Sequence, residues 1–535
     1  MQFKRYYNTL KYLKITQIRY QLWYRIRRYW RKIIGFTYPL SIVKGSYPLQ
    51  LTPCIDKPVS LESSKFTFLN QSTDYHPVID WNESQNGKLW AYNLNYMDYL
   101  LQPNMELATG LELIDKFIAD LPGNSTGLEP YPIALRGINW IKFLSQHRSQ
   151  ITDHATLSTI NNSLYAQYCI LLDNLEYHLL GNHLLEDAFS LLFGAFYFKD
   201  EKLYSKACQL LHRELEEQIL KDGAHFELSP MYHQILLDRL LDCINLVQNN
   251  TLFDNQDKII RLMREKAVSM ISWINIMTFS DGTIPLLNDS TYGIAPTTNQ
   301  LKAYATSLNL IRDNSCNSRT LSDSGYRKFT GTNYECIIDV GHIGPDYIPG
   351  HAHSDTFNFH LQVNDQPLIV DTGISTYNKN QHRQAERSTE AHNTVQYGNH
   401  EQSDVWGGFR VSKRARIMQL EEDDKKIKAS HNGYCQLAVN HERTFESNTD
   451  SLIITDVVKG KQTENSTARF HFTPGQHPEI NNKTAYFSGG KVVFSGKSEI
   501  KLKDYSYAAG YNKLQEAKCI EVTFNDQLTT HFTFN

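Results

Sequence analysis

The stretch from His351 to Gly373, HAHSDTFNFHLQVNDQPLIVDTG, decides how the second half of the chain is interpreted. From Phe357 to Val363 apolar residues alternate with polar ones, and this period of two indicates a strand. Asn364 and Asp365 then supply a turn, after which Leu368 begins a second strand. Further segments with strand character lie at 451–458, 466–473, 491–496 and 519–534. The sequence therefore predicts an all-β region after about residue 320.

Upstream of this point the pattern is helical. Ser229 is a good N-cap and Pro230 suits the first position of a helix. An apolar stripe at helical spacing follows, formed by Leu236, Leu240, Cys243, Ile244 and Val247. Similar stripes occur at 111–121, 133–146, 157–179, 183–198, 203–219 and 256–277. Consecutive amphipathic helices with short connections pack as hairpins, in a bundle, a solenoid or a closed toroid.

The start of the chain is a basic arm. Residues 1–55 contain eleven Lys and Arg, and the first acid is Asp56. The segment YRIRRYWRK at 24–32 mixes cations with aromatic rings, which suits an anionic surface such as a polymer, lipid headgroups or nucleic acid. A solvated amphipathic helix packed on the next domain is the alternative. The pattern contains no apolar run of about 18 residues and no signal-peptide core, so neither a transmembrane helix nor a standard signal peptide is expected.

Composition sets broad limits on the class of protein. A chain of 535 residues exceeds one ordinary core, so two or three domains are expected. Hydrophobic residues at 41% and charged residues at 21% are typical of a soluble globular protein. The abundant Tyr and Phe favour bulky core packing over sugar-binding platforms when composition alone is considered. The eight cysteines are scattered without a CxxC pair, which indicates neither a disulfide framework nor a cysteine zinc site.

Histidine and aspartate residues in and after the opening stretch suggest a metal site. His353, Asp371 and His392 offer the imidazole and carboxylate ligands that Zn²⁺ accepts. A simple hairpin that turns at 364–365 puts Asp371 opposite about Asn358, so His353 has to curl back on a loop to join the set. Loop histidines that only hydrogen-bond to nearby carboxylates are the alternative interpretation.

Two motifs of the helical region carry polar groups near predicted helix starts. Asn182 and Glu186, within GNHLLED, share one face of a helix, although a helix cap with solvent-facing groups also explains them. Tyr232 falls in the first turn after Ser229, where the positive end of the helix dipole favours a phenolate. A tyrosine so placed can exchange a proton with a substrate, although most lone tyrosines are structural.

A third motif, YPIALRGINW at 131–140, suggests a substrate contact. Arg136 can clamp a carboxylate or sulfate with two hydrogen bonds, and Trp140 lies one turn further on, where it can form a sugar platform. An arginine that covers the end of a helix is the alternative.

Taken together, these motifs resemble the heparinase II/III-like lyases. The resemblance runs from about residue 80 to the end and is strongest in 351–402, where the opening stretch is followed by RSTEAHNTVQYGNHEQ. GNHLLEDA at 181–188 and DGAHFELSPMYHQILLD at 222–238 support it. The resemblance implies an α+β multidomain fold, an incomplete (α/α) toroid followed by an antiparallel β-sandwich. We accordingly expect a basic arm and linker at 1–80, the toroid at 81–320 and the sandwich at 321–535.

The resemblance also implies roles for individual residues. The expected zinc ligands are His353, Asp371 and His392, and the metal shapes the cleft more than it activates water. The expected catalytic residues are Tyr232, His351, Asn182 and His183. The last two bind the carboxylate of the uronate. Plausible substrate contacts are Glu186, Arg136 and Trp140.

These residue types fit β-elimination from a uronic acid. Hydrogen-bond donors on the carboxylate stabilise the enolate-like charge that develops when the C5 proton leaves. A base removes that proton, and an acid protonates the leaving oxygen on C4, which yields an unsaturated product. Tyr232 serves both roles when the two groups share one face of the sugar ring. His351 is the base when they lie on opposite faces.

Other functions remain open at this point. A glycoside hydrolase on the same toroid needs two carboxylates, with Glu186 or Asp187 paired with Glu227 or Asp289. A non-catalytic polysaccharide-binding protein does not need Asn182, Tyr232 and His351 together. A metallohydrolase would use the histidine and aspartate set directly. The expected partner is an acidic polysaccharide of the heparin, alginate, capsule or exopolysaccharide type. Nucleic acid is not expected, and no oligomeric state is predicted.

The cellular location follows from the same features. The missing signal peptide suggests a member associated with the polysaccharide synthesis of its own cell, at the bacterial cell envelope in the periplasm or on a membrane. A cytoplasmic location is the alternative. Residues 1–45 are the segment expected to make a peripheral contact with a membrane or another anionic surface.

Overall fold

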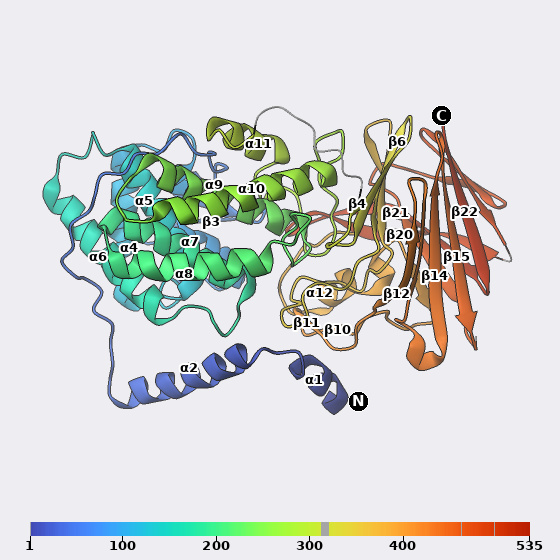
Figure 1. The fold of residues 1–535 in the computed structure, drawn as a ribbon, viewed down its shortest axis with the longest axis horizontal. Helices are drawn as coiled ribbons and strands as arrows, with labels where there is room; N and C mark the ends of the chain where they lie inside the picture. Colours follow the sequence, from blue (N-terminus) through green and yellow to red (C-terminus); the bar gives the residue numbers. More distant parts are fainter. Residues whose placement is uncertain (1, 312–319, 462, 497) are drawn as a thin grey trace.

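The structure is a computed structural model that describes residues 2–311, 320–461, 463–496 and 498–535. A helical region and a β region lie side by side, with the helices on the left and the strands on the right of Figure 1. The last helix before the junction is α11 (Thr298–Ser307), and the first strand after it is β4 (Thr320–Leu321). Among the described residues, no helix has the length and apolarity that crossing a membrane requires.

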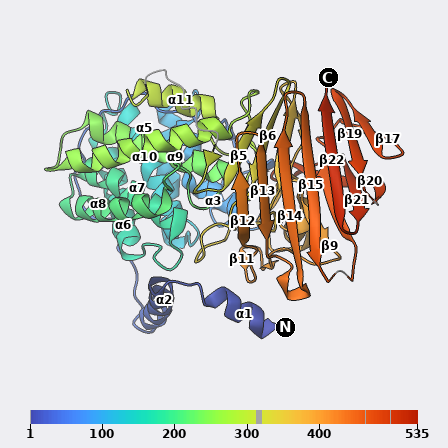
Figure 2. The same cartoon turned by 45° about the vertical axis from the view of Figure 1, so that its right-hand side comes forward.

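The N-terminal arm folds into two helices, α1 (Gln2–Leu10) and α2 (Ile15–Ile33). Both views show them outside the main body, with α1 towards the β region and α2 beneath the helical region (Figures 1 and 2). A small antiparallel sheet follows, which the sequence did not predict within the linker. Its strands are β1 (Leu61–Glu62), β2 (Lys65–Phe68) and β3 (Gln71–Asp74). The sheet packs on α3 (Lys88–Tyr96), whose Trp90 indole donates to the Gln71 carbonyl at 3.0 Å.

Inner and outer helices alternate along the helical region. Almost every residue of the inner helices is buried: α5 (Pro130–Gln146), α7 (Gly181–Phe198) and α9 (Pro230–Asn249). The outer helices expose one face: α4 (Leu107–Asp120), α6 (His154–Asp173), α8 (Glu201–Gln218) and α10 (Gln256–Met277). The cause is compositional, because α7 is apolar around most of its circumference whereas α8 carries charge on one side. This alternation confirms the predicted incomplete α/α toroid.

The β region is an antiparallel sandwich, as predicted. One layer is an eight-stranded sheet of β12 (Ile417–Glu422), β13 (Lys426–His431), β14 (Val439–Ser447), β15 (Ser451–Gly460), β22 (Gln527–Phe534), β19 (Gly490–Ser495), β18 (Thr484–Phe487) and β17 (Glu479–Asn481). The other layer combines two sheets, joined by a bridge between Ile369 and Phe472. They are β4, β5 (Tyr326–Thr330), β6 (Tyr334–Asp339), β7 (Phe359–Val363) and β8 (Gln366–Ile369), and β20 (Ser498–Gly510), β21 (Lys513–Phe524), β16 (Ser466–His471) and β9 (Val395–Tyr397). Inward residues of both layers share one core.

Loops between these strands turn back towards the helical region. The β7–β8 hairpin turns at Asn364 and Asp365, as predicted, and both residues have positive φ. Past the hairpin, whose register is shifted by a bulge between Leu361 and Gln362, the side-chain amide of Asn358 donates to Asp371 at 2.6 Å, so these two residues lie close together. The loop before β7 does curl back, since the Ser354 amide donates to the Arg387 carbonyl at 3.0 Å. The opening histidines thereby reach the junction of the two regions.

Candidate functional site

A cleft of about 1330 Å³ lies where the two regions and the N-terminal arm meet. The helical region contributes residues of α3, α5, α7 and α9, and the β region contributes the loops around 346–351, 376–379 and 406–411. Residues of α1 and α2 form a further wall. The four predicted catalytic residues line this cleft together: Asn182, His183, Tyr232 and His351. The structure thus brings the predicted catalytic residues into one cavity, although they come from distant parts of the chain.

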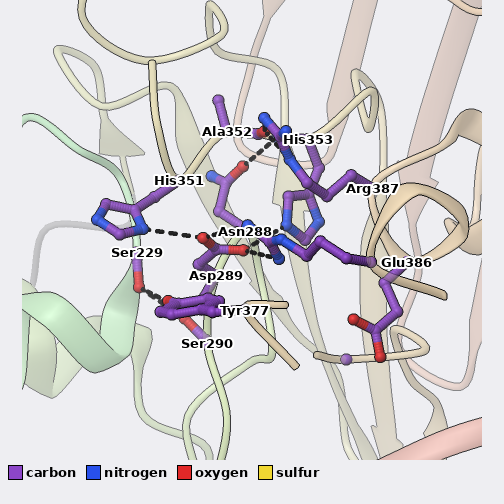
Figure 3. A network of polar contacts seen from close by, with 12 residues as sticks. Ser229, Asn288, Asp289, Ser290, His351, Ala352, His353, Tyr377, Glu386 and Arg387 are labelled. Atoms are coloured by element: carbon purple, nitrogen blue, oxygen red, sulfur yellow. Dashed lines mark hydrogen bonds and ion pairs between the residues drawn. The ribbon is translucent and has the colours of Figure 1, made fainter. Parts of the chain in front are cut away.

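A buried aspartate, Asp289, organises the centre of the site. The Arg383 guanidinium donates to both of its oxygens, at 2.6 and 2.7 Å. His351 Nδ1 and His353 Nε2 contact the same carboxylate at 2.9 and 2.8 Å, and Figure 3 shows both rings approaching it. Burial alone raises the pKa of Asp289, but Arg383 and the two histidines outweigh burial and hold it well below its usual range. Asp289 is therefore a permanent anion that accepts hydrogen bonds.

The contact with Asp289 fixes the orientation of His351. Because the carboxylate can only accept, Nδ1 carries the proton, and in the neutral form of the imidazole Nε2 holds the lone pair. Nε2 lies 3.4 Å from the Asn182 amide nitrogen and 3.6 Å from a Glu227 oxygen. The ring lies against that of Tyr232, with centroids 4.0 Å apart and an interplanar angle of 33°. This geometry presents a proton acceptor beside a phenol.

Tyr232 occupies the first turn of α9, as the sequence predicted. Its backbone amide donates to Ser229 Oγ at 3.3 Å, which confirms the predicted N-cap. Its hydroxyl lies 3.1 Å from the Tyr377 hydroxyl. Burial raises the pKa of Tyr232 above its ordinary value, and the Tyr377 contact offsets this only in part. The helix dipole therefore does not produce a resting phenolate, and the hydroxyl begins as a proton donor.

Asn182 is held by Glu227 rather than by the end of its own helix. Its backbone amide and its side-chain nitrogen contact the two Glu227 oxygens, at 3.1 and 2.7 Å. This leaves the other amide hydrogen free to point towards His351. The neighbouring His183 lies against the Tyr131 ring, with centroids 4.6 Å apart, and its Nδ1 is 3.0 Å from Glu176. Burial lowers the pKa of His183, but Glu176 outweighs burial, so the pKa lies above the ordinary value.

A carboxylate and a guanidinium face each other elsewhere in the cleft. Glu186 is fully buried, and neither of its oxygens has a hydrogen-bond partner among the described residues. Arg239 Nε lies 3.7 Å from it, and Nε and Nη1 of Arg239 also lack hydrogen bonds in the described chain. Burial raises the pKa of Glu186 to about 7. Both residues line the cleft, and Arg239 also forms ion pairs with Asp238 and Asp242 at 3.8 Å. The pair therefore offers guanidinium hydrogens without hydrogen bonds and a carboxyl group that titrates near neutrality.

Two predicted substrate contacts are wrong. Arg136 is fully buried in α5, where it donates to the Gln167 side chain and to the carbonyls of Asn95 and Gly127. Trp140 is also fully buried, and its indole nitrogen lies 3.2 Å from the Met97 sulfur. The physical reason is that only Tyr131 and Leu135 of α5 line the cleft, whereas Arg136 and Trp140 lie on parts of the helix that neighbouring segments cover.

The predicted metal ligands lie close together, but they contact each other. The His353 and His392 rings have centroids 5.2 Å apart, and His392 Nδ1 contacts Asp371 at 2.7 Å. His353 Nδ1 and His392 Nε2 are buried atoms without a hydrogen-bond partner in the described part of the chain, which suits a ligand. Across the described residues, however, no group of three or more His, Cys, Asp or Glu side chains is arranged to hold a metal ion. The donor types fit zinc, whereas the arrangement is that of hydrogen-bonded loop histidines.

Several site residues were missed by the sequence reasoning. Asp289 was considered only as a hydrolase carboxylate, and Tyr377, Arg383 and Arg239 were not considered. Arg383 and Asp289 are 94 positions apart and come from different regions, so no local periodicity relates them. Arg239 carries a usable signal, since it lies two helical turns after Tyr232 on the same face of α9.

Comparisons with known proteins extend over both regions. A family model described as Heparinase II/III N-terminus matches residues 137–313, and one described as Heparinase II/III-like, C-terminal matches residues 315–534. A heparin-sulfate lyase of Pedobacter heparinus is 24% identical over 245 residues, which are 41% of this chain and 36% of that protein. A heparin-sulfate lyase of Bacteroides stercoris is 26% identical over 255 residues, 42% of this chain and 36% of that protein. The aligned stretch thus spans about a third of each curated relative.

Solved structures share the fold. A heparinase III structure superposes with a TM-score of 0.66 at 16% identity, covering 87% of this chain and 81% of that one. A heparan sulfate lyase HepC mutant from Pedobacter heparinus gives 0.60 at 16% identity, with 88% and 81% covered. A chondroitin AC lyase from Streptomyces coelicolor A3, in complex with chondroitin sulphate, gives 0.54 at 9% identity, with 84% and 74% covered. At these identities the likeness concerns the fold.

Proposed function

The chain belongs to the heparinase II/III-like family, and from this premise we propose that it is a polysaccharide lyase. It cleaves a uronate-containing polysaccharide of the glycosaminoglycan class by β-elimination. The observation that carries the proposal is the meeting of Tyr232, His351 and Asn182 in one cleft, with the first two rings 4.0 Å apart. The relatives named as heparin-sulfate lyases support the same chemistry.

The first task of the site is to hold the uronate carboxylate. The side-chain amide of Asn182 is fixed by Glu227 at 2.7 Å, and its second hydrogen, which faces His351 Nε2 at 3.4 Å, turns to the substrate carboxylate when the polymer binds. His183, whose pKa is raised by Glu176 against the effect of burial, supplies a second donor at the start of the same helix. Donors that are already oriented stabilise the charge that grows on the carboxylate as the C5 proton leaves.

Proton transfer then falls to Tyr232 and His351. His351 Nε2 has its lone pair available because Asp289 accepts the Nδ1 proton. Tyr232 carries a proton at neutral pH, so it protonates the leaving oxygen on C4. With the C5 proton and the leaving group on opposite faces of the ring, His351 is the base and Tyr232 the acid. When both groups lie on one face, Tyr232 carries out both steps, after passing its proton to a neighbouring base.

The experiment is a screen of uronate polymers for products that absorb in the ultraviolet. Heparan-type, chondroitin-type, alginate-type and bacterial capsule or exopolysaccharide polymers are incubated with the protein. Absorbance and reducing ends are then measured in parallel. A lyase raises both signals together because each cleavage creates one double bond. Reducing ends without absorbance would contradict the proposal.

A glycoside hydrolase is supported less well by the geometry. Asp289 is locked by Arg383, and Glu227 has both oxygens bound to Asn182. Asp187 is fully buried and accepts the Glu176 backbone amide at 2.7 Å. Among the described residues that line the cleft, only Glu186 of the four carboxylates considered is present. A hydrolase needs two carboxylates that flank the scissile bond.

We also propose that His353, Asp371 and His392 bind Zn²⁺. Its support is the set of donor types and the two unpartnered imidazole nitrogens. The rings have to turn from their present hydrogen bonds, and a bound ion would stiffen the loops behind His351. Metal analysis of the purified protein tests this directly, together with thermal unfolding before and after chelation. A protein with less than about one zinc per ten chains, and with an unchanged unfolding temperature, has no such site.

A further inference from the structure

The N-terminal arm presents an apolar stripe to solvent. At 100° per residue, Ile15, Leu22, Ile26 and Ile33 fall on one side of α2, with aromatic rings beside them. Ile15 is 84% exposed, Ile26 62% and Trp30 60%. Helix α1 continues this surface with Phe3, Tyr7 and Leu10, all exposed. An apolar surface of this length on a soluble body indicates a binding surface.

The opposite, polar side of α2 is the side that attaches it to the body. The Tyr24 hydroxyl donates to the Leu175 carbonyl at 2.5 Å, and the Gln17 amide donates to the Leu179 carbonyl at 3.1 Å. Arg27 donates to the Asp173 carbonyl at 2.7 Å. A surface helix ordinarily buries its apolar stripe and leaves its polar side in water. Here the order is reversed over most of the helix: apart from Leu22, which lines the cleft, the stripe is available to something other than the body.

Positive charge flanks the stripe. Some cations of the arm are neutralised by acids of the body: Arg5 by Asp404, Lys14 by Glu217, Arg27 and Arg31 by Asp173, and Lys44 by Asp200. The others form none of the salt bridges found within the described residues: Lys4, Lys11, Arg19, Arg25, Arg28 and Lys32. Uncompensated cations beside an exposed aliphatic and aromatic stripe are the pattern of a helix that lies in a membrane interface.

We propose that the arm, residues 2–36, docks the protein on an anionic lipid surface. The headgroups attract the free cations, and the acyl region receives the side chains of the stripe. A second copy of this chain would cover the apolar stripe, but it would also bring two positively charged arms together. Nucleic acid would neutralise the cations, but it offers no hydrocarbon surface for the isoleucine and leucine side chains. A lipid surface satisfies both, and this contact places the protein at a membrane of the cell envelope.

The position of the arm gives docking a consequence for the cleft. Residues Leu10, Ile18 and Leu22 of the arm line the cleft. Helix α1 is tied to the β region by Arg5 with Asp404, and by Tyr6, whose ring meets Trp406 at a centroid distance of 5.0 Å. Both figures show the two helices along one edge of the molecule (Figures 1 and 2). Docking therefore sets the cleft beside the membrane, where a surface-attached polymer is within reach.

Co-sedimentation of the full chain with vesicles tests the proposal. One set is phosphatidylcholine alone, and the other contains about 30% phosphatidylglycerol. The wild type is expected to bind the anionic set, with a blue shift of tryptophan fluorescence from Trp23 and Trp30, and to bind the neutral set at least tenfold less. Ile26→Asp combined with Ile33→Asp is expected to reduce binding to the anionic set at least tenfold.

Two further variants distinguish an effect on the surface of the arm from a general effect on folding. Val268→Asp changes a residue of α10 that is 43% exposed outside the arm, and it is expected to bind as the wild type does. Arg19→Gln combined with Lys32→Gln keeps the stripe and is expected to weaken binding about tenfold or more, with a smaller dependence on salt than the wild type. All variants are compared by thermal unfolding before vesicle binding is measured.

Three results would overturn the proposal. The wild type could bind anionic and neutral vesicles equally weakly. The Ile26→Asp and Ile33→Asp variant could bind as well as Val268→Asp. Light scattering could instead show a wild-type dimer that this variant converts to a monomer, without vesicle binding by either. The stripe would then be an interface between copies of the chain.

Discussion

Asp289 shows how a single residue sets the chemistry of the cleft. It is a fully buried anion, bound at both oxygens by Arg383, and it holds the imidazoles of His351 and His353. A buried ion pair contributes little net stability compared with apolar packing, but removing one partner leaves an uncompensated charge. The pair is therefore best understood as a device that orients His351.

Replacing Arg383 with methionine is expected to destabilise the protein by about 3–5 kcal/mol, because Asp289 is left charged in a buried position. Chemical unfolding at neutral pH measures the loss. Lys459→Met is the matched control, since Lys459 is 59% exposed and pairs with Glu442 at the surface. The control is expected to cost less than about 1 kcal/mol. Equal losses in the two variants would show that the buried pair has no special role.

Glu186 predicts how stability depends on pH. Burial raises its folded pKa to about 7, above the unfolded value, so the folded state keeps a proton that the unfolded state has released. Stability from this residue is present at about pH 5 and is lost as pH rises towards 7 and beyond. In Glu186→Gln the fall in unfolding temperature between about pH 5 and pH 8 is expected to be smaller than in the wild type. An identical fall in both would mean that Glu186 does not titrate in this range, and Glu112→Gln, at an exposed site, is the control.

At the scale of elements, the start of α9 connects catalysis to folding. Ser229 caps the helix through the Tyr232 amide and also donates to the Asp289 carbonyl at 2.8 Å. Figure 3 shows Ser229 against Ser290, whose hydroxyl is 2.9 Å away. One side chain thereby fixes the distance between the helix that carries Tyr232 and the segment that carries Asp289.

Ser229→Ala is expected to cost about 0.5–2 kcal/mol of stability and to lower kcat, because Tyr232 and His351 lose their common support. Thr297→Ala removes an equivalent cap from α11, where Thr297, which does not line the cleft, accepts the Gln300 amide. It is expected to lose similar stability and to leave kcat unchanged. Steady-state kinetics on the polymer found by the screen compare the two. A similar fall in kcat in both variants would reduce the role of Ser229 to general stability.

At the scale of the whole molecule, the sequence predicts the architecture better than the contacts. The change of period from helical to alternating is local, so the order of helices and strands follows from it. The turn of the β7–β8 hairpin was also predictable from Asn364 and Asp365, whereas the bulge between Leu361 and Gln362 that shifts its register was not. Contacts between the helical region and the β region could not be predicted. Asp289 and Arg383, for example, meet only when both regions have folded. Arg136 and Trp140 were misjudged because sequence spacing does not reveal which face of α5 lines the cleft and which faces are covered by neighbouring segments.

The central claim is that Tyr232 transfers a proton during elimination. Tyr232→Phe keeps the ring against His351 and removes only the hydroxyl, and Tyr511→Phe does the same to another tyrosine that lines the cleft. The measurement is the rate at which unsaturated product appears from the best polymer of the screen. We predict that Tyr232→Phe lowers kcat by about 10²–10⁴-fold, while Tyr511→Phe stays within about threefold of the wild type. Full turnover in Tyr232→Phe would contradict the account.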